Sequence, residues 1–284
     1  MSLGVLNNIA AIYSQNNLNQ TQNSLQNTLT QLSSGSRINS GADDAAGLAL
    51  ADGLHANVAA LTQSAQNATA GVGLLQTADG ALSQVTNLLN RAVTLATEAA
   101  NGTLNSSQVS SANQEYQNIL TEIGNIGSTT NFNGNGVFSA TPTNVFVSDG
   151  TASGATTFSE TIGALTTASV GTSSAGGGVD FTAAGVATLS AATATSVLTS
   201  LTTAIQDVAY QRGTIGANIN QLNAASNVAN SESVNLTAAE NSVRATNYGQ
   251  ATSDMAKFKV LSQTGIAALS QANSVQQDVL KLLQ

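Results

Sequence analysis

A seven-residue hydrophobic repeat in the first third of the chain is the feature that most constrains the fold. Leu or Ala recurs at every seventh position from Leu54 to Ala96, and a second, largely apolar row follows four positions behind, from Val58 to Ala100. This alternation of four and three residues keeps one apolar stripe on one side of an α-helix. The pattern predicts a long helix that belongs to a coiled coil or a helical bundle.

Interruptions in the repeat predict where the buried face of this helix shifts, and the flanking residues predict where the helix begins and ends. Asp79 and Thr86 interrupt the second row, so we expect the buried face to shift there to Ala78, Val85 and Ala92. Ser40, with Asp43 three places later, fits an N-terminal capping pattern. Asn101 and Gly102 supply a typical C-terminal stop.

Two further helices follow from the same kind of spacing. One is expected from about residue 106 to the break at 127–130, and another from about residue 190 through a stripe that ends at Leu222. Each has a single apolar stripe, which has to be buried against another helix. The expected fold class is therefore mainly α: an elongated antiparallel helical bundle or coiled coil formed by the N- and C-terminal segments.

Residues 131–188 have a different composition and are expected to be a small β-hairpin insertion. The stretches 132–138, 143–154 and 156–163 contain β-branched and aromatic residues separated by Gly and Asn-Gly turn signals. The Ser, Thr and Gly tract at 166–178 predicts a loop.

Both ends of the chain carry weaker helical stripes that contain Ala and Gly and leave polar gaps. Their members in the N-terminal segment are Leu18, Leu25, Leu29 and Leu32. Those in the C-terminal segment are Leu261, Gly265, Ala268, Ala272, Val275, Val279 and Leu282. Such stripes bury little apolar area per residue, so we expect both ends to be largely disordered in the monomer and to become helical on assembly.

The distribution of charge also separates the two ends of the chain from its middle. Residues 1–42 and 236–284 are nearly neutral, whereas 43–235 hold two Arg against twelve acidic residues. Neutral ends can lie against copies of themselves without accumulating repulsion, and an acidic middle keeps an assembly soluble. We expect 1–42 with 236–284 to form one layer and 43–235 to form another.

The composition argues against several classes of function. With no Cys and one His the chain offers no thiolate chemistry, and a zinc site is not expected. No catalytic constellation or phosphate-binding loop is recognisable, so we expect neither an enzyme nor a cofactor. A net charge of −8 argues against nucleic-acid binding. No apolar run long enough to cross a membrane and no cleavable signal sequence is recognisable.

The segment LSSGSRINSGADDAAGLALA at 32–51 resembles the N-terminal signature of the bacterial flagellins. Further similar stretches are NNLN at 16–19, ATEAANGT at 96–103, TNFNG at 130–134 and the tail at 261–284. The resemblance covers about 1–139 and 190–284, with both ends in the right order.

The resemblance implies a structural subunit that polymerises into the extracellular flagellar filament used for swimming. In this family the terminal helices pair as an inner layer, D0, and a helical rod with β-hairpins forms an outer layer, D1. The subunit is exported unfolded and without cleavage through the flagellar type III apparatus. Implied partners are other copies of itself, an export chaperone that holds the C-terminal stripe, and the cap and hook-associated proteins. The D0–D1 joint maps onto Gly35, Arg37, Asn39, Asp43 and Asp44.

Some flagellins are sensed by Toll-like receptor 5 through a D1 patch whose matching positions here are Arg91, Leu95 and Glu115. Asn90, Val93 and Thr94 depart from the charged or amide residues typical of that patch, so we expect only weak recognition. Two alternatives stay open: a hook–filament junction protein, which shares the terminal signatures, and a non-flagellar secreted coiled-coil adhesin.

Overall fold

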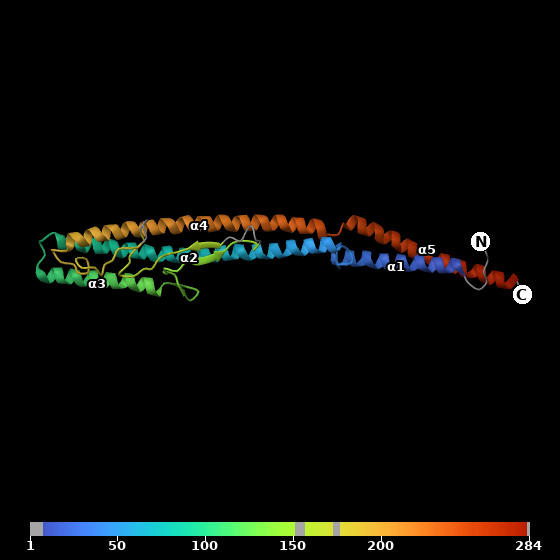
Figure 1. Cartoon of the computed structure of the whole chain (residues 1–284), viewed down its shortest axis with the longest axis horizontal. Helices are drawn as coiled ribbons and strands as arrows, with labels where there is room; N and C mark the ends of the chain where they lie inside the picture. The colour runs from blue at the N-terminus through green and yellow to red at the C-terminus, as the bar shows by residue number, and fades with distance from the viewer. Residues whose placement is uncertain (1–7, 151–156, 173–176, 283–284) are drawn as a thin grey trace. The chain divides into compact units, whose positions relative to one another are not determined.

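A computed structural model describes residues 8–150, 157–172 and 177–282 of the chain (Figure 1). Within these ranges five helices account for most residues: α1 (Ile9–Ser34), α2 (Ala45–Ala100), α3 (Ser106–Thr129), α4 (Ala194–Arg244) and α5 (Tyr248–Leu282). Four short strands lie between α3 and α4: β1 (Asn131–Phe132), β2 (Asn135–Gly136), β3 (Thr143–Phe146) and β4 (Thr157–Glu160). The predicted mainly α class with a β-hairpin insertion is confirmed.

The chain divides into two compact units, which we name by their place in the sequence. The terminal unit consists of Met1–Ala56 and Asn235–Gln284, and the central unit consists of Asn57–Val234. Both units join segments from distant parts of the chain. We describe each unit separately.

The core of the central unit is built on the seven-residue repeat of α2. Leu75, Leu82 and Leu89 from the first row are fully buried, as expected. The predicted shift of the buried face is also confirmed, because Ala78, Val85 and Ala92 have no exposed surface. The other two helices contribute fully buried side chains that include Tyr116 and Ile123 from α3 and Leu201, Ile215 and Leu222 from α4.

Helices α3 and α4 both run antiparallel to α2 (Figure 1), and an ion pair links each of them to it. Arg91 on α2 forms a two-pronged pair with Glu115 on α3, with Nε 2.7 Å from Oε1. Asp79 on α2 pairs in the same way with Arg212 on α4, with Oδ1 2.7 Å from Nε. The residue that interrupts the apolar row is therefore used as a link between the two long helices.

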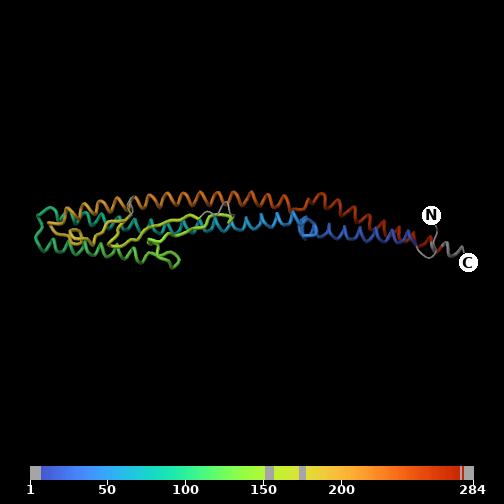
Figure 2. Tube along the Cα trace, viewed as in Figure 1, coloured from blue at the N-terminus to red at the C-terminus, as the bar shows by residue number. Residues whose placement is uncertain are grey.

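The β insertion lies against these helices, and its two hairpins confirm the predicted strands. β1 pairs with β2, and β3 pairs with β4, both antiparallel. Figure 2 shows that the described parts of this segment, 130–150, 157–172 and 177–193, run along the helices of the central unit. Val145 of β3 lies beside Gly71 of α2, and Phe181 is buried in the same core as the helices.

The structure corrects three expected helix ends. Ser40 does not cap α2; Asp44 does, through a hydrogen bond from the Gly47 amide to its Oδ1. Helix α3 does not stop before Gly127 but continues to Thr129, and Gly127 lies buried in close contact with the backbone of Leu165. Helix α4 begins at Ala194, after a turn in which Ser190 and Thr193 bond to one another.

In the terminal unit, α1 and α5 pair in antiparallel fashion (Figure 1). Near the start of α1, Asn8 Nδ2 donates to the Ala272 carbonyl oxygen at 2.9 Å. Midway along the helix, Leu18 lies against Gly265. Beyond the end of α1, the Thr246 amide donates to the Gly35 carbonyl oxygen at 3.0 Å. The first and last parts of the described chain therefore form one helical pair.

Candidate assembly surface of the terminal helices

The contact between α1 and α5 is narrow and partly polar. Its half-buried residues on α1 include Leu18, Leu25 and Leu32 from the predicted stripe, but also Ser14, Thr21 and Ser24. Leu29, the fourth predicted member, is 47% exposed. A contact with so many hydroxyl groups buries less apolar area than a leucine seam of the same length.

On α5 the buried face lies beside the predicted stripe and overlaps it only in part. Gly265 and Ala272 belong to the predicted stripe and are half-buried. Three residues that were not predicted, Phe258, Ser262 and Leu269, are half-buried as well. Leu261 and Val275 from the predicted stripe are 43% and 47% exposed, and Ala268 is exposed as well. We call Leu261, Ala268 and Val275 the uncovered flank of α5. The side chains of the last two predicted members, Val279 and Leu282, lie outside the described residues.

Large apolar side chains are exposed elsewhere on these two helices. On α1 they are Ile9, Ile12 and Tyr13, and on α5 they are Val260 and Ile266, each more than half exposed. Exposed apolar side chains scattered singly are normal, whereas several on one helical pair mark a surface that another molecule covers. The terminal unit therefore has exposed apolar surface that its own described residues do not cover.

The segment between α1 and α2 is tied to the end of α4 by backbone hydrogen bonds. Gly35 ends α1 in the left-handed conformation at φ 70°, which glycine adopts without a steric penalty. The Arg37 amide donates to the Arg244 carbonyl oxygen at 2.7 Å, and Arg37 Nη2 donates to the Val243 carbonyl oxygen. Ile38 is 1% exposed and anchors the segment. The residues of the predicted joint therefore lie in an ordered connection.

Within this connection the two neighbouring carboxylates have separate roles. Asp43 Oδ2 accepts hydrogen bonds from the amides of Asn39 and Ser40 and from the Ser40 hydroxyl, and so closes the turn before α2. Asp44 caps the helix itself. The hydrogen bonds from Asn39 and Ser40 hold the pKa of Asp43 below its ordinary value.

We expect Asp43→Asn to loosen this turn. Because the folded-state pKa of Asp43 is lowered, its stabilising effect is present above the unfolded value and is lost as the pH falls through the folded value. The amides of Asn39 and Ser40 should be less protected from exchange in the variant, and their protection factors should no longer fall as the carboxylate is protonated in acid. The measurement is residue-resolved hydrogen exchange. Asp44→Asn is the matched control, since Asn is also a good cap, and equal exchange in both variants would contradict the assignment.

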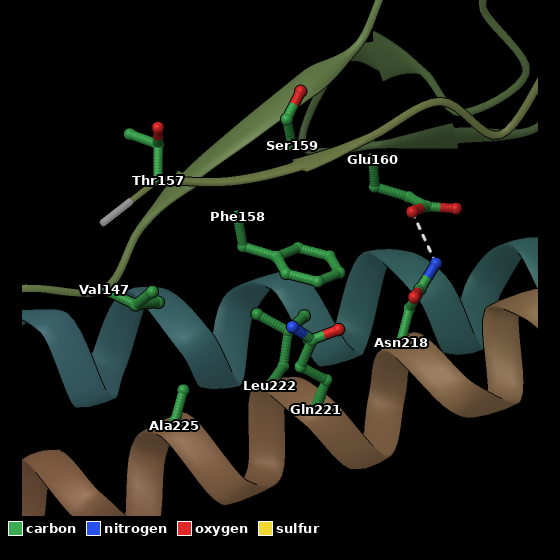
Figure 3. Close-up of a pocket in the computed structure, with 9 residues that line it drawn as sticks. All are labelled: Val147, Thr157, Phe158, Ser159, Glu160, Asn218, Gln221, Leu222 and Ala225. Atoms are coloured by element: carbon green, nitrogen blue, oxygen red, sulfur yellow. Dashed lines mark hydrogen bonds between the residues drawn. The ribbon is translucent and has the colours of Figure 1, made fainter.

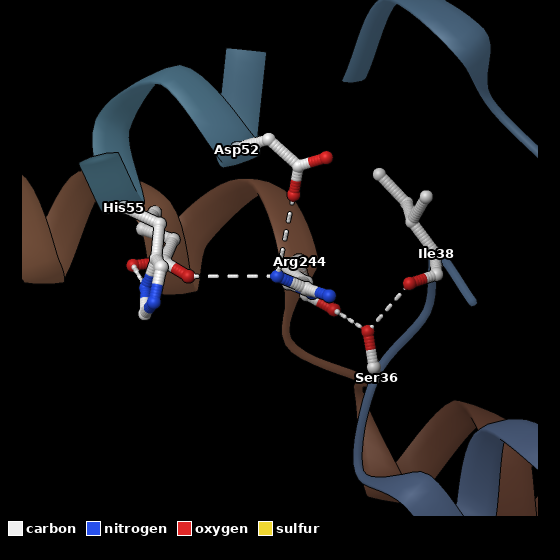
Figure 4. A network of polar contacts seen from close by, with 6 residues as sticks. Ser36, Ile38, Asp52, His55 and Arg244 are labelled. Atoms are coloured by element: carbon white, nitrogen blue, oxygen red, sulfur yellow. Dashed lines mark hydrogen bonds and ion pairs between the residues drawn. The ribbon is translucent and has the colours of Figure 1, made fainter. Parts of the chain in front are cut away.

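A small polar network lies beside the joint (Figure 4). Glu240 on α4 is 3.4 Å from His55 Nδ1 and 3.7 Å from Arg244 Nη1, and Arg244 also lies 3.7 Å from Asp52 Oδ1. The Ser36 hydroxyl donates to the carbonyl oxygens of Ile38 and Arg244. The His55 side chain is 69% exposed. Pairs this long and this exposed contribute little to stability.

The three positions matched to a receptor patch are not equally accessible. Arg91 and Glu115 are on the surface of the central unit and pair with each other, which lowers the pKa of Glu115 and raises that of Arg91. Leu95 is 2% exposed and belongs to the core. The folded central unit therefore presents the charged pair and not the leucine.

The described residues contain neither a helix that could span a membrane nor a cluster of metal ligands. No helix among them has an apolar stretch that would span a bilayer. They also contain no group of three or more His, Cys, Asp or Glu side chains placed to hold a metal ion.

Two family models match opposite ends of the chain. One is described as the bacterial flagellin N-terminal helical region and matches residues 5–143, which include α1, α2, α3 and the first hairpin. The other is described as the bacterial flagellin C-terminal helical region and matches residues 198–283 in α4 and α5. The two matched regions contain the helices that pair with each other: α1 pairs with α5 in the terminal unit, and α2 pairs with α4 in the central unit.

Curated relatives agree with these matches. The chain is 42% identical over 144 residues to Flagellin 1 of Proteus mirabilis, covering 51% of this chain and 40% of that protein. It is 43% identical over 127 residues to phase 1 flagellin of Salmonella naestved, covering 45% of this chain and 25% of that protein. The crystal structure of Bacillus cereus flagellin is 31% identical, with a TM-score of 0.47, covering 57% of this chain and 88% of that one. The chain thus spans two fifths or less of the curated relatives' length. It belongs to the bacterial flagellin family.

Proposed function

We propose that this protein is the repeating subunit of a bacterial flagellar filament, a structural protein that polymerises outside the cell for swimming motility. The observation that carries the proposal is the uncovered flank of α5, on a helical pair that both ends of the chain build together. A contact surface made from both termini suits head-to-tail addition of identical copies, and heterologous contacts of this kind produce open helical polymers.

In this proposal the terminal pair is the D0 layer, residues 1–42 with 236–284, and residues 43–235 are the D1 rod with 131–188 as its variable part. The joint at Gly35, Arg37, Asn39, Asp43 and Asp44 connects the layers. The many hydrogen bonds of the joint support this role, because a filament under torque needs a defined connection between its layers.

The export route and the further partners follow from family membership. The subunit travels unfolded through the flagellar type III apparatus, without a cleaved signal peptide, and a chaperone holds the C-terminal stripe before export. Cap and hook-associated proteins then contact the growing polymer. The small apolar area between α1 and α5 supports unfolded passage, because a weakly held pair opens at low cost. Sensing by Toll-like receptor 5 would rest on Arg91 and Glu115 and would be weak.

The narrow α1–α5 contact also supports a transition from disorder to order on assembly. Ser14, Thr21 and Ser24 on α1 and Ser262 on α5 occupy positions where a stable pair would carry apolar side chains. The pair then gains much of its order from neighbouring copies that cover the flank.

The test of this surface is the double variant Leu261→Asn with Val275→Asn. We expect it to raise the critical concentration for polymerisation about tenfold or more, because each half-exposed side chain contributes roughly 1 kcal/mol when neighbouring copies bury it. The measurement is seeded growth of purified protein, followed by light scattering and by electron microscopy of the tubes.

Ala256→Asn is the control, since Ala256 is exposed on the same helix but is neither part of the flank nor one of its large exposed apolar side chains. Circular dichroism of all monomers checks that helix content is unchanged. Equal growth of the double variant and the unmodified protein would rule out the flank as a contact. Failure of the unmodified protein to lengthen seeds would overturn the proposed function itself.

A further inference from the structure

A pocket of about 400 Å³ lies in the central unit, between the β3–β4 hairpin and α4 (Figure 3). One wall is apolar and is made by Val147, Phe158, Leu222 and Ala225, and the polar lining includes Glu160, Asn218 and Gln221. In Figure 3 the Phe158 ring lies between the hairpin and α4, while Ser159 and Thr157 point away from the helix. This volume is large enough for a small organic molecule.

The carboxylate of Glu160 is the chemically distinctive group of this pocket. It is half-buried, and its Oε2 accepts a hydrogen bond from the neutral amide of Asn218. In the described parts of the chain no Lys, Arg or His side chain forms an ion pair with it, and Arg212 of α4 pairs with Asp79 of α2. A carboxylate partly withdrawn from water without a cation beside it is unfavourable, and a bound cation would relieve this.

We propose that this pocket binds a small organic cation, an alkylammonium group whose charge lies on Glu160 and whose hydrocarbon part lies along Phe158 and Leu222. An ammonium group matches the carboxylate, and the aromatic ring and aliphatic wall match a short alkyl chain. The same chemistry exists in two forms, a free amine and the side chain of a lysine from a neighbouring copy.

Protonation should compete with this cation. Burial raises the pKa of Glu160 above its ordinary value, although the hydrogen bond from Asn218 opposes the shift, and no other charged group contributes to it. As the pH falls through this raised pKa, the carboxylate becomes neutral and the cation loses its partner. Binding should therefore be present near neutral pH and should weaken in acid.

The experiment is a titration of the monomer with n-butylammonium, followed by the amide chemical shifts of β4 and α4. We expect saturable shifts around Phe158, Glu160 and Asn218 with a dissociation constant of about 1 to 10 mM, typical of so small a ligand. n-Butanol, which has a similar size and no charge, should bind at least about tenfold more weakly. Glu160→Gln should weaken butylammonium binding by a similar factor.

Two further variants distinguish a loss of the binding site from a general effect on folding. Glu122→Gln is the matched control, since Glu122 also accepts a hydrogen bond from an Asn side chain but is exposed on α3. It should leave binding unchanged. Gln221→Glu adds a second carboxylate to the pocket lining and should tighten binding severalfold, a gain that misfolding cannot produce.

Polymerisation of Glu160→Gln distinguishes the two sources of the cation. Normal growth with lost butylammonium binding identifies a free amine as the ligand, and a raised critical concentration identifies a side chain of the neighbouring copy. Equal shifts with butylammonium and butanol, or unchanged binding in Glu160→Gln, would overturn the proposal. Neither of these results would affect the proposed filament function, which is tested with the unmodified protein.

Discussion

Removal of residues 265–284 should abolish polymerisation while the central unit stays folded. The truncation deletes the second half of α5, including Gly265 and Ala272, which lie against Leu18 of α1 and against Asn8, which caps α1. It also removes Val275 and Ala268 from the uncovered flank. The remaining α1 would then expose an apolar stripe that is too weak to hold a helix by itself.

The central unit should not respond to this change, because its core is formed within Asn57–Val234. The expected result is an absence of tubes after seeding, together with an unchanged main thermal transition by circular dichroism or calorimetry. Removal of residues 283–284 alone is the control, since it leaves the whole of α5 in place. Filaments of normal length from the longer truncation would show that the C-terminal helix is dispensable for assembly.

The sequence alone predicted the helical core well, because a repeat of seven residues depends only on local geometry. The rows of α2 specify which side of the helix is buried, and even the shift caused by Asp79 and Thr86 was predictable from the neighbouring apolar residues. The hairpins were predictable for the same reason, since Asn-Gly turns and β-branched runs are local signals.

Local sequence patterns did not predict which side chains form ion pairs or which residue caps a helix. The pairing of Asp79 with Arg212 joins residues 133 positions apart, and no local pattern indicates it. Ser40 and Asp44 both satisfy the rules for a helix cap, and only the actual register of the chain selects Asp44.

The terminal stripe on α5 shows a second limit of pattern analysis. The expected stripe followed the apolar residues, whereas the buried face is centred on Phe258, Ser262 and Leu269. A helix that has two kinds of neighbour, its own partner and other copies, carries more apolar residues than one contact uses. The proposed filament function explains the discrepancy, because the surplus residues form the uncovered flank.

Gly127→Ala should strongly destabilise the central unit. Gly127 is buried in α3, and a methyl group added there would overlap the carbonyl oxygen of Leu165 and approach its carbonyl carbon to 2.8 Å. These are backbone atoms, so relief requires the chain around Leu165 to move away from the core. Overpacking of this kind costs about 2–3 kcal/mol, which lowers the melting temperature of a unit this size by roughly 4–12 °C.

Gly124→Ala is the matched comparison, since Gly124 lies one turn earlier on the same helix. An added methyl group there would meet only Thr167 Cγ2, at an ordinary contact distance of 3.5 Å. Because alanine is the better helix former, this variant should be about 0.5–1 kcal/mol more stable than the unmodified protein. Thermal and urea unfolding of the two variants should therefore shift in opposite directions. A Gly127→Ala protein that unfolds together with Gly124→Ala would mean that the insertion yields freely, and that the close contact between α3 and residue 165 does not hold the central unit together.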